Sequence, residues 1–231
     1  MSPPLRPAEL PDLVYRLGRA PDAWEWPDWS YVNADGTFGN RYDDPEGQYR
    51  VLYASTEREA TFRESLARFR ADPAVVAAQI STAGDEDAPA SIPAGVVPAA
   101  WLSRRRIGSA ELIGTFCDVG HADSLAHLRE HLAPRLLHYG MDDLDAGEIR
   151  TRAPRRFTQE VSRHVFLQTS TNREPAFAGI RYGSRLGDNL TNWAIFEPNQ
   201  PFVVESAAEI DADDADLRVT LDAYDLVLQG Q

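Results

Sequence analysis

The sequence predicts an α+β fold, in which strand-like segments alternate irregularly with helical ones. Short apolar runs with alternating polar residues are typical of strands, while longer segments repeat apolar residues every three or four positions, as helices do. These segments do not follow the regular strand–helix–strand order of a doubly wound sheet. With 231 residues, 43% of them hydrophobic and 10% aromatic, the chain is long enough for one domain with a sizeable core.

The basic residues exclude two classes of chemistry. All 23 of them are arginine, and no lysine occurs anywhere in the chain. Walker-type phosphate loops and Schiff-base catalysis both require a lysine, so both are excluded. Arginine can still bind a phosphate, because its planar guanidinium donates two parallel hydrogen bonds.

The net charge of −13 argues against direct nucleic-acid binding, which depends on a basic surface. Acidic residues are concentrated in residues 205–225, which we interpret as a solvated face, with docking of a basic partner as the alternative. The single Cys117 leaves no intrachain disulfide and no multi-cysteine zinc site. No apolar run reaches the ~18 residues of a membrane span and the start lacks a signal pattern, so we expect a cytoplasmic protein without membrane contact.

The most informative stretch passes from a turn through a strand into a helix. Glycine, asparagine, aspartate and proline gather in residues 38–45, as they do in tight turns. Residues 49–55 alternate apolar and polar side chains, which predicts a strand. A helix is expected from Thr56 to about Arg70, with Thr56 as its N-cap and Glu59 reaching back in a capping box. These elements would bring an arginine, a tyrosine and a glutamate to one edge of a sheet.

Glu64 lies on the side of this helix that faces away from its apolar stripe. At ~100° per residue, Phe62, Leu66 and Phe69 form the stripe, and Glu64 lies nearly opposite. A carboxylate in such a place is usually solvated, and spacing alone favours that interpretation. The alanines on either side of Glu64 would also suit a helix that lines a ligand cleft.

Other segments are assigned from the same patterns. Residues 13–17 indicate a first strand that carries Arg16, either an edge arginine in solvent or a second phosphate-binding arginine. Tryptophans at 24–29 could form a lid, a partner surface or ordinary packing. In the middle of the chain we expect a strand or short helix at 74–80, a loop or linker at 82–99, surface arginines at 104–106 and a strand at 110–119. Two helices should follow, one at 123–139 that Pro134 kinks or splits and one at 158–167. The last part is expected to form two strands in 180–196 around a turn at 187–189, and then a strand, an acidic helix and an apolar end in 202–228.

His127 and His131 match an inverted zinc-protease pattern, His-x-x-Glu-His. Two histidines four residues apart on a helix can bind zinc together. A leucine stripe from Leu125 to Leu136 lies on the opposite side of that helix, which places both histidines and His138 toward solvent. A catalytic metal needs a partly dry cavity and no third ligand is indicated, so we interpret the motif as a chance match and expect no metal.

Two parts of the chain resemble a known family. Gly39-Asn40-Arg41-Tyr42-Asp43, Val51-Leu52-Tyr53-Ala54-Ser55 and Glu64 resemble the core of the RES domain family, named for its Arg, Glu and Ser. Gly179-Ile180-Arg181-Tyr182-Gly183-Ser184-Arg185 and Asn192-Trp193-Ala194-Ile195-Phe196 resemble the part that supplies the Ser. The resemblance covers residues 38–66 and 179–197, with Asn40 in place of a usual glycine and Tyr42 in place of a usual Trp or Phe. It implies an ADP-ribosyltransferase-like fold of mixed sheets flanked by helices, in a single domain over residues 1–231.

The resemblance also implies an activity and a site. Family members are typically toxins of bacterial toxin–antitoxin pairs that cleave the nicotinamide–ribose bond of NAD⁺. By this resemblance, Glu64 would steady the positive charge that develops on the ribose, and Arg41 would bind phosphate or orient the ribose. Tyr53 would stack on or brace the nicotinamide side, Ser184 would form a hydrogen bond within the pocket, and Arg16 would help to hold the dinucleotide.

Each of these residues also has an ordinary structural explanation. Tyr53 could be a core aromatic, Ser184 a turn residue, and Arg41 a turn arginine paired with Asp43 or Asp44. What favours the functional interpretation is that the positions typical of the family occur in the right order.

The acceptor of the reaction stays open in the sequence. Water would make the protein a glycohydrolase, phosphate a phosphorylase, and a protein side chain a mono-ADP-ribosyltransferase. A non-catalytic RES-like protein that binds a nucleotide or a partner is a further alternative. The resemblance implies NAD⁺ as the substrate, and a toxic enzyme would need a separate neutralising protein, typically a helix-turn-helix antitoxin.

Overall fold

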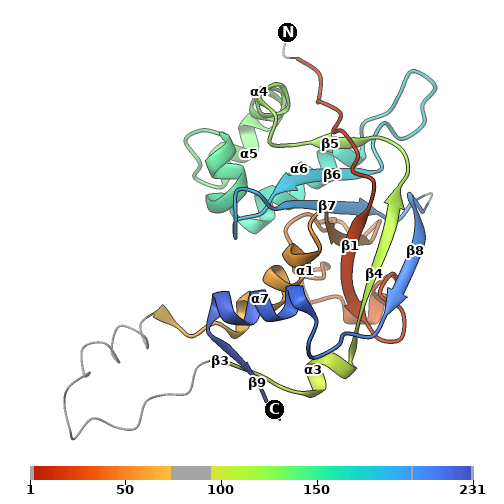
Figure 1. The fold of residues 1–231 in the computed structure, drawn as a ribbon. Helices are drawn as coiled ribbons and strands as arrows, with labels where there is room; N and C mark the ends of the chain where they lie inside the picture. The colour runs from red at the N-terminus through yellow and green to blue at the C-terminus, as the bar shows by residue number, and fades with distance from the viewer. Residues whose placement is uncertain (1–2, 74–94, 199, 230–231) are drawn as a thin grey trace, which may run out of the picture.

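The structure is a computed structural model that describes residues 3–73, 95–198 and 200–229. Within these residues, seven strands form one mixed sheet in the order β5-β6-β7-β2-β1-β4-β8 (Figure 1). The strands are β1 (Val14–Arg19), β2 (Val51–Ser55), β4 (Arg105–Leu112), β5 (Phe116–Asp118), β6 (Gly179–Gly183), β7 (Thr191–Phe196) and β8 (Phe202–Ala208). Neighbouring strands are antiparallel except β5 and β6, and β3 (Gly95–Val97) pairs with β9 (Leu226–Leu228) in a separate parallel ladder. The predicted α+β class is confirmed.

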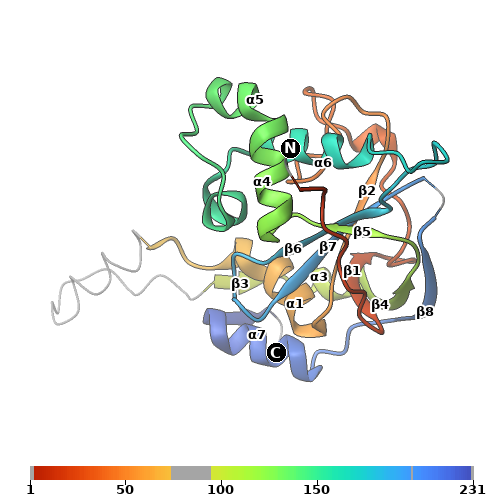
Figure 2. The same cartoon turned by 90° about the horizontal axis from the view of Figure 1, so that it is seen from above.

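The helices form two groups, with the strands between them in the view of Figure 2. The first group is α4 (Ala122–His131), α5 (Ala133–His138) and α6 (Arg155–Phe166), and the second is α1 (Arg58–Leu66), α3 (Ala100–Ser103) and α7 (Ala215–Tyr224). Short turns of other helical types cover Trp29–Tyr31, Ala67–Phe69 and Glu148–Arg152. Among the described residues, no helix has the length and hydrophobicity needed to cross a lipid bilayer.

The core follows the alternation of side chains along the strands. In β7, Ala194 and Phe196 pack with the α4–α6 group, whereas Trp193 and Ile195 pack on the opposite face of the sheet. That opposite face is covered by the N-terminal loops, where Trp24 stacks against a phenylalanine of β8. Of the three roles that the sequence allowed for these tryptophans (a lid, a partner surface or packing), Trp24 has the last.

Several boundaries differ from the sequence-based expectation. The strand expected at 110–119 is wrong in extent, because Gly114, at φ +94°, turns the chain between β4 and β5. The loop expected at 82–99 is wrong at its end, where β3 pairs with β9; residues 82–94 and the segment 74–80 lie outside the described residues. Pro134 splits the expected helix at 123–139 into α4 and α5, as predicted.

The capping box expected at the start of α1 is wrong. The Thr56 hydroxyl accepts a hydrogen bond from the indole of Trp193 at 2.9 Å, and Glu59 pairs with Arg63 at 2.5 Å. The N-cap position is taken by Glu57, whose carboxylate accepts the backbone N–H of Thr191 at 2.7 Å. Both side chains that precede α1 are therefore bonded to β7, which fixes the start of the helix against the sheet.

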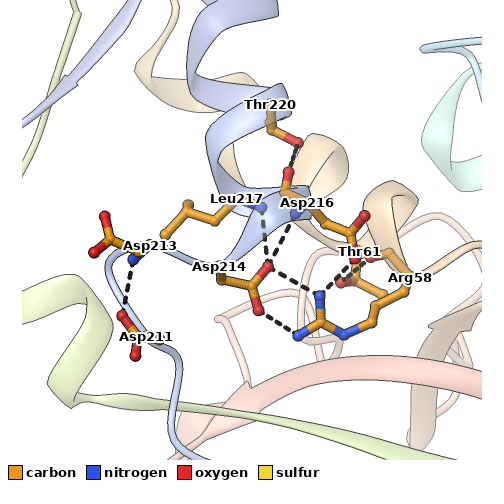
Figure 3. A network of polar contacts seen from close by, with 8 residues as sticks. All are labelled: Arg58, Thr61, Asp211, Asp213, Asp214, Asp216, Leu217 and Thr220. Atoms are coloured by element: carbon orange, nitrogen blue, oxygen red, sulfur yellow. Dashed lines mark hydrogen bonds and ion pairs between the residues drawn. The ribbon is translucent and has the colours of Figure 1, made fainter.

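The sequence suggested that the acidic segment at 205–225 is a solvated face, but two of its carboxylates also form structural contacts. Asp214 is the N-cap of α7 and accepts hydrogen bonds from the backbone N–H groups of Asp216 and Leu217 at 3.1 and 3.2 Å (Figure 3). Arg58, at the start of α1, forms ion pairs with Asp214 and Asp216, and both hydrogen bonds raise its pKa. These carboxylates thus connect α7 to α1, the helix that carries Glu64.

The histidines of α4 are only partly solvated. The leucine stripe is confirmed, since Leu128 and Leu136 are buried, and His131 and His138 are exposed as expected. His127 is half-buried, contrary to expectation: its Nδ1 lies 3.0 Å from the carbonyl oxygen of Pro3, and its Nε2 lies 3.1 Å from Nε2 of His164 on α6. In the described part of the chain, no group of three or more His, Cys, Asp or Glu is arranged to hold a metal ion.

We expect Arg58→Ala to lower the free energy of unfolding by about 1–2 kcal/mol, because it removes a bidentate ion pair and leaves the Asp214 and Asp216 carboxylates unpaired. Arg129→Ala is the control, since its ion pair with Asp143 is exposed on both sides and its loss should change the midpoint little. Urea denaturation of both variants measures the difference. Equal midpoints would show that α7 does not hold α1 through Arg58.

The pKa of His164 is lowered to about 4, first by burial and then by the charges of His127 and His131. Between about pH 6.5 and 4, the unfolded chain binds a proton at this residue and the folded chain does not, so stability falls as the pH falls. We expect the urea midpoint to be lower at pH 5 than at pH 7, and His164→Gln to reduce this difference. A variant with the full wild-type pH dependence would contradict the assignment.

Candidate active site

Glu64 is held on one side only. Its Oε1 accepts a hydrogen bond from the Ser184 hydroxyl and another from the Asn192 side-chain amide, each at 2.7 Å. Its Oε2 receives no hydrogen bond from any other described residue. Two hydrogen bonds to a charged acceptor stabilise one orientation of the carboxylate. The free oxygen is left for a ligand.

A second layer of hydrogen bonds orients both donors. Ser55, at the end of β2, donates its hydroxyl hydrogen to the Asn192 side-chain carbonyl at 2.6 Å, so the amide group of Asn192 faces Glu64. The Ser184 hydroxyl accepts the backbone N–H of Leu186 at 3.0 Å, which directs its own hydrogen to Glu64. Ser55, Ser184 and Asn192 are all buried. The position of the carboxylate is therefore set by the sheet and the β6–β7 loop, as well as by α1.

Glu64 faces a cavity of about 630 Å³, a size typical of ligand sites. The cavity begins where the main sheet divides: β1 pairs with β4 along its whole length, but with β2 only between Tyr15 and Ser55. Among the described residues that line the cavity, four are arginines and Glu64 is the single carboxylate. In a chain with a net charge of −13, this gives a local excess of positive charge.

Arg16 occupies the gap between β1 and β2. Its NH1 donates to the Tyr53 carbonyl and its Nε donates to the Ala23 carbonyl, each at 2.8 Å. Burial and the nearby charge of Arg105 lower the pKa of Arg16 to about 10. Because β1 does not pair with β2 beside Tyr53, Arg16 supplies the donor that a neighbouring strand would otherwise provide.

Arg41 also lines the cavity, but its guanidinium is bonded to the backbone. NH1 donates to the Arg150 carbonyl at 2.6 Å, and NH2 donates to the Ile149 carbonyl. The Arg150 guanidinium in turn donates to the carbonyls of Ser184 at 2.5 Å and Gly187 at 2.8 Å. Arg41 is thus connected through Arg150 to the loop that presents Ser184 to Glu64.

Tyr53 fixes the loop that carries Arg41. Its hydroxyl donates to Asp43 at 2.9 Å and accepts the backbone N–H of Tyr42 at 3.0 Å, while its ring lines the cavity. Asp43 accepts the Asn40 N–H at 2.6 Å as well, and burial raises the pKa of Asp43. Asp44 pairs with Arg163, so the alternative in which Arg41 pairs with Asp43 or Asp44 is wrong.

The structure brings the residues expected from the sequence together. Arg16, Arg41, Tyr53 and Glu64 line one cavity, whereas Ser184 lies behind Glu64 and contacts it directly. The functions assigned to them by resemblance stay predictions.

Four further residues of the site were given no role from the sequence. Asn192 could have been singled out, since it is a polar residue at the start of an otherwise apolar strand. Tyr182 lines the cavity, and burial and the charge of Glu64 raise its pKa. Arg155 and Arg185 are the other two arginines among the described lining residues. Arg185 lies in a segment that resembles the family, whereas nothing in the local sequence distinguishes Arg155 from the other arginines of the chain.

One of two comparisons with known proteins identifies a family. A search of curated proteins found no match to the chain. The family model of the RES domain matches residues 13–222, which covers most of the 231 residues and every element of the site described above. RES domains are a toxin-associated, NAD-related family. The chain belongs to the RES domain family.

Proposed function

We propose that this protein cleaves the nicotinamide–ribose bond of NAD⁺. The observation that supports the proposal most strongly is a single carboxylate, held by two donors, in a cavity lined by four arginines. NAD⁺ has the complementary charges, with an anionic diphosphate in its middle and a cationic nicotinamide–ribose at one end. Arginines suit the first group and a carboxylate the second.

The chemistry needs little more than this arrangement. Nicotinamide departs as a neutral base, so the reaction does not require a general acid. As the bond lengthens, positive charge develops on the ribose, in a state similar to the oxocarbenium ion of glycoside hydrolysis. The free Oε2 of Glu64 stabilises that charge, and the fixed Oε1 keeps the carboxylate from rotating away.

The reaction products identify the group that accepts the ADP-ribose. Reaction in Tris buffer yields ADP-ribose if water is the acceptor. Reaction in phosphate buffer yields an ADP-ribose phosphate ester if the enzyme is a phosphorylase. Label transferred from NAD⁺ to a protein band would identify a mono-ADP-ribosyltransferase.

We also propose that the activity is toxic to the cell that makes it. Depletion of NAD⁺ would then require a separate neutralising protein, and a helix-turn-helix antitoxin is the kind of partner that the family implies. The support for this part is the membership of a toxin-associated family. Growth arrest on expression of the wild type, relieved by a neighbouring reading frame, tests it.

We expect Glu64→Gln to reduce nicotinamide release by about 10²–10³-fold, because the substituted amide cannot balance the developing positive charge. The unfolding midpoint should stay unchanged. Glu59→Gln is the matched control, since Glu59 lies on the same helix and pairs with Arg63. A Glu64→Gln enzyme as fast as the control would exclude the proposed role.

Removal of either donor to Glu64 should lower kcat about tenfold with little change in KM, since each hydrogen bond to a charged group contributes about 1.5 kcal/mol. The variants are Ser184→Ala and Asn192→Ala, measured with saturating NAD⁺. The double variant should lose less than the product of the two single effects, because both bonds act on the same oxygen. Unchanged kcat in both single variants would contradict this.

A further inference from the structure

The four arginines of the cavity fall into two classes. Arg16 and Arg41 each donate two hydrogen bonds to backbone carbonyls. Arg155 and Arg185 donate none to any described residue, although both line the same cavity. A guanidinium that already satisfies buried carbonyls would leave them unpaired if it turned to a ligand, whereas an uncommitted one would not.

The lack of a carboxylate partner distinguishes Arg155 and Arg185 from their neighbours. Arg156 pairs with Asp35, and Arg150 pairs with Asp188. In a chain with 36 acidic residues against 23 basic ones, a nearby carboxylate is easy to find. Within the described residues, however, neither cavity arginine forms an ion pair. The charge of Arg155 acts on Asp43, whose pKa it lowers, but Asp43 is already hydrogen-bonded to Tyr53 and Asn40.

The two free arginines come from different elements of the fold. Arg155 is the first residue of α6, and its NH1 lies 3.8 Å from where a side chain at Gly39 would begin. Gly39 has φ +82°, a conformation that favours glycine, so no side chain stands beside Arg155 at this position. Arg185 directly follows Ser184, whose hydroxyl donates to Glu64.

We propose that Arg155 and Arg185 bind the diphosphate of the dinucleotide, while Arg16 and Arg41 shape the cavity without gripping phosphate. This inference rests on the proposed function and changes the assignment that the sequence suggested. The diphosphate spans the space between the α6 wall and the β6–β7 loop, so that the nicotinamide–ribose reaches Glu64. Specificity for a diphosphate-linked substrate then comes from these two arginines.

The test uses Arg155→Gln and Arg185→Gln in the full-length chain. We expect each substitution to raise KM for NAD⁺ about tenfold and to change kcat by less than about threefold, because a diphosphate contact acts on binding rather than on the reacting bond. Arg156→Gln and Arg173→Gln are the controls, since the first lies beside Arg155 and faces Asp35 and the second is exposed. KM values equal to those of the controls would overturn the proposal.

Nicotinamide riboside separates a diphosphate contact from a general loss of the site. It carries the same bond but no diphosphate, so kcat/KM for its cleavage should be the same in the wild type and in both variants. An equal loss with both substrates would overturn the assignment. Arg41→Gln should instead lower the urea midpoint and kcat together, because it frees the carbonyls of Ile149 and Arg150.

Equilibrium binding keeps this inference distinct from the proposed function. Calorimetric titration with ADP-ribose measures the diphosphate contact without any turnover, and affinity should fall about tenfold in Arg155→Gln and in Arg185→Gln. If ADP-ribose binds the wild type more tightly than both variants but the wild type releases no nicotinamide from NAD⁺, the proposed function fails and the diphosphate assignment stands. If nicotinamide is released and ADP-ribose binds both variants as tightly as the wild type, the diphosphate assignment fails alone.

Discussion

The site depends on the two hydrogen bonds that Oε1 of Glu64 accepts from Ser184 and Asn192. They connect helix α1 to the β6–β7 loop and to strand β7, which lie 120 and 128 residues further along the chain. Glu64 is exposed on the side of its helix, as its spacing in the sequence suggests, and without these bonds nothing would fix its orientation. With them, one oxygen is fixed and the other faces a cavity, an asymmetry that suits stabilisation of a positive charge at one defined place.

The rest of the fold keeps α1 where these bonds can form. Its first turn is tied to β7 through Thr56 and Glu57, and to α7 through Arg58. On the other side of the cavity, Arg41 and Arg150 connect the turn at 38–45 to the β6–β7 loop. Both arginines act through backbone carbonyls, which makes them positioning residues for Ser184. The divided sheet between β1 and β2 leaves room for a ligand among these supports.

Local patterns were enough to predict the elements of the site, because their signals are short-range. The turn at 38–45, strand β2, the helix carrying Glu64 and the break at Pro134 all follow from residues within one or two turns of each other. The capping box failed for the opposite reason: Thr56 has the right neighbours for an N-cap, but the indole of the distant Trp193 takes its hydroxyl. A tertiary contact replaced a local one of similar strength.

Which charged side chains form ion pairs could not be predicted from the sequence. Arg58 pairs with Asp214, which lies more than 150 residues later in the chain. Part of the acidic segment that the sequence indicated to be solvated is therefore a structural contact. Nor could the sequence distinguish Arg155 from Arg156, since one lines the cavity unpaired and the other faces Asp35. Resemblance pointed to Arg41 and Arg16 because it follows positions along a chain. The structure adds that each of them donates two hydrogen bonds to backbone carbonyls.

The role of Glu64 can be seen in a structure of the protein with a non-cleavable NAD⁺ analogue. We expect the anomeric carbon of the nicotinamide ribose to lie against Oε2 of Glu64, while Ser184 and Asn192 keep their hydrogen bonds to Oε1. An analogue bound outside this cavity would exclude that role. So would a complex in which Ser184 and Asn192 leave Glu64 to bind the ligand themselves.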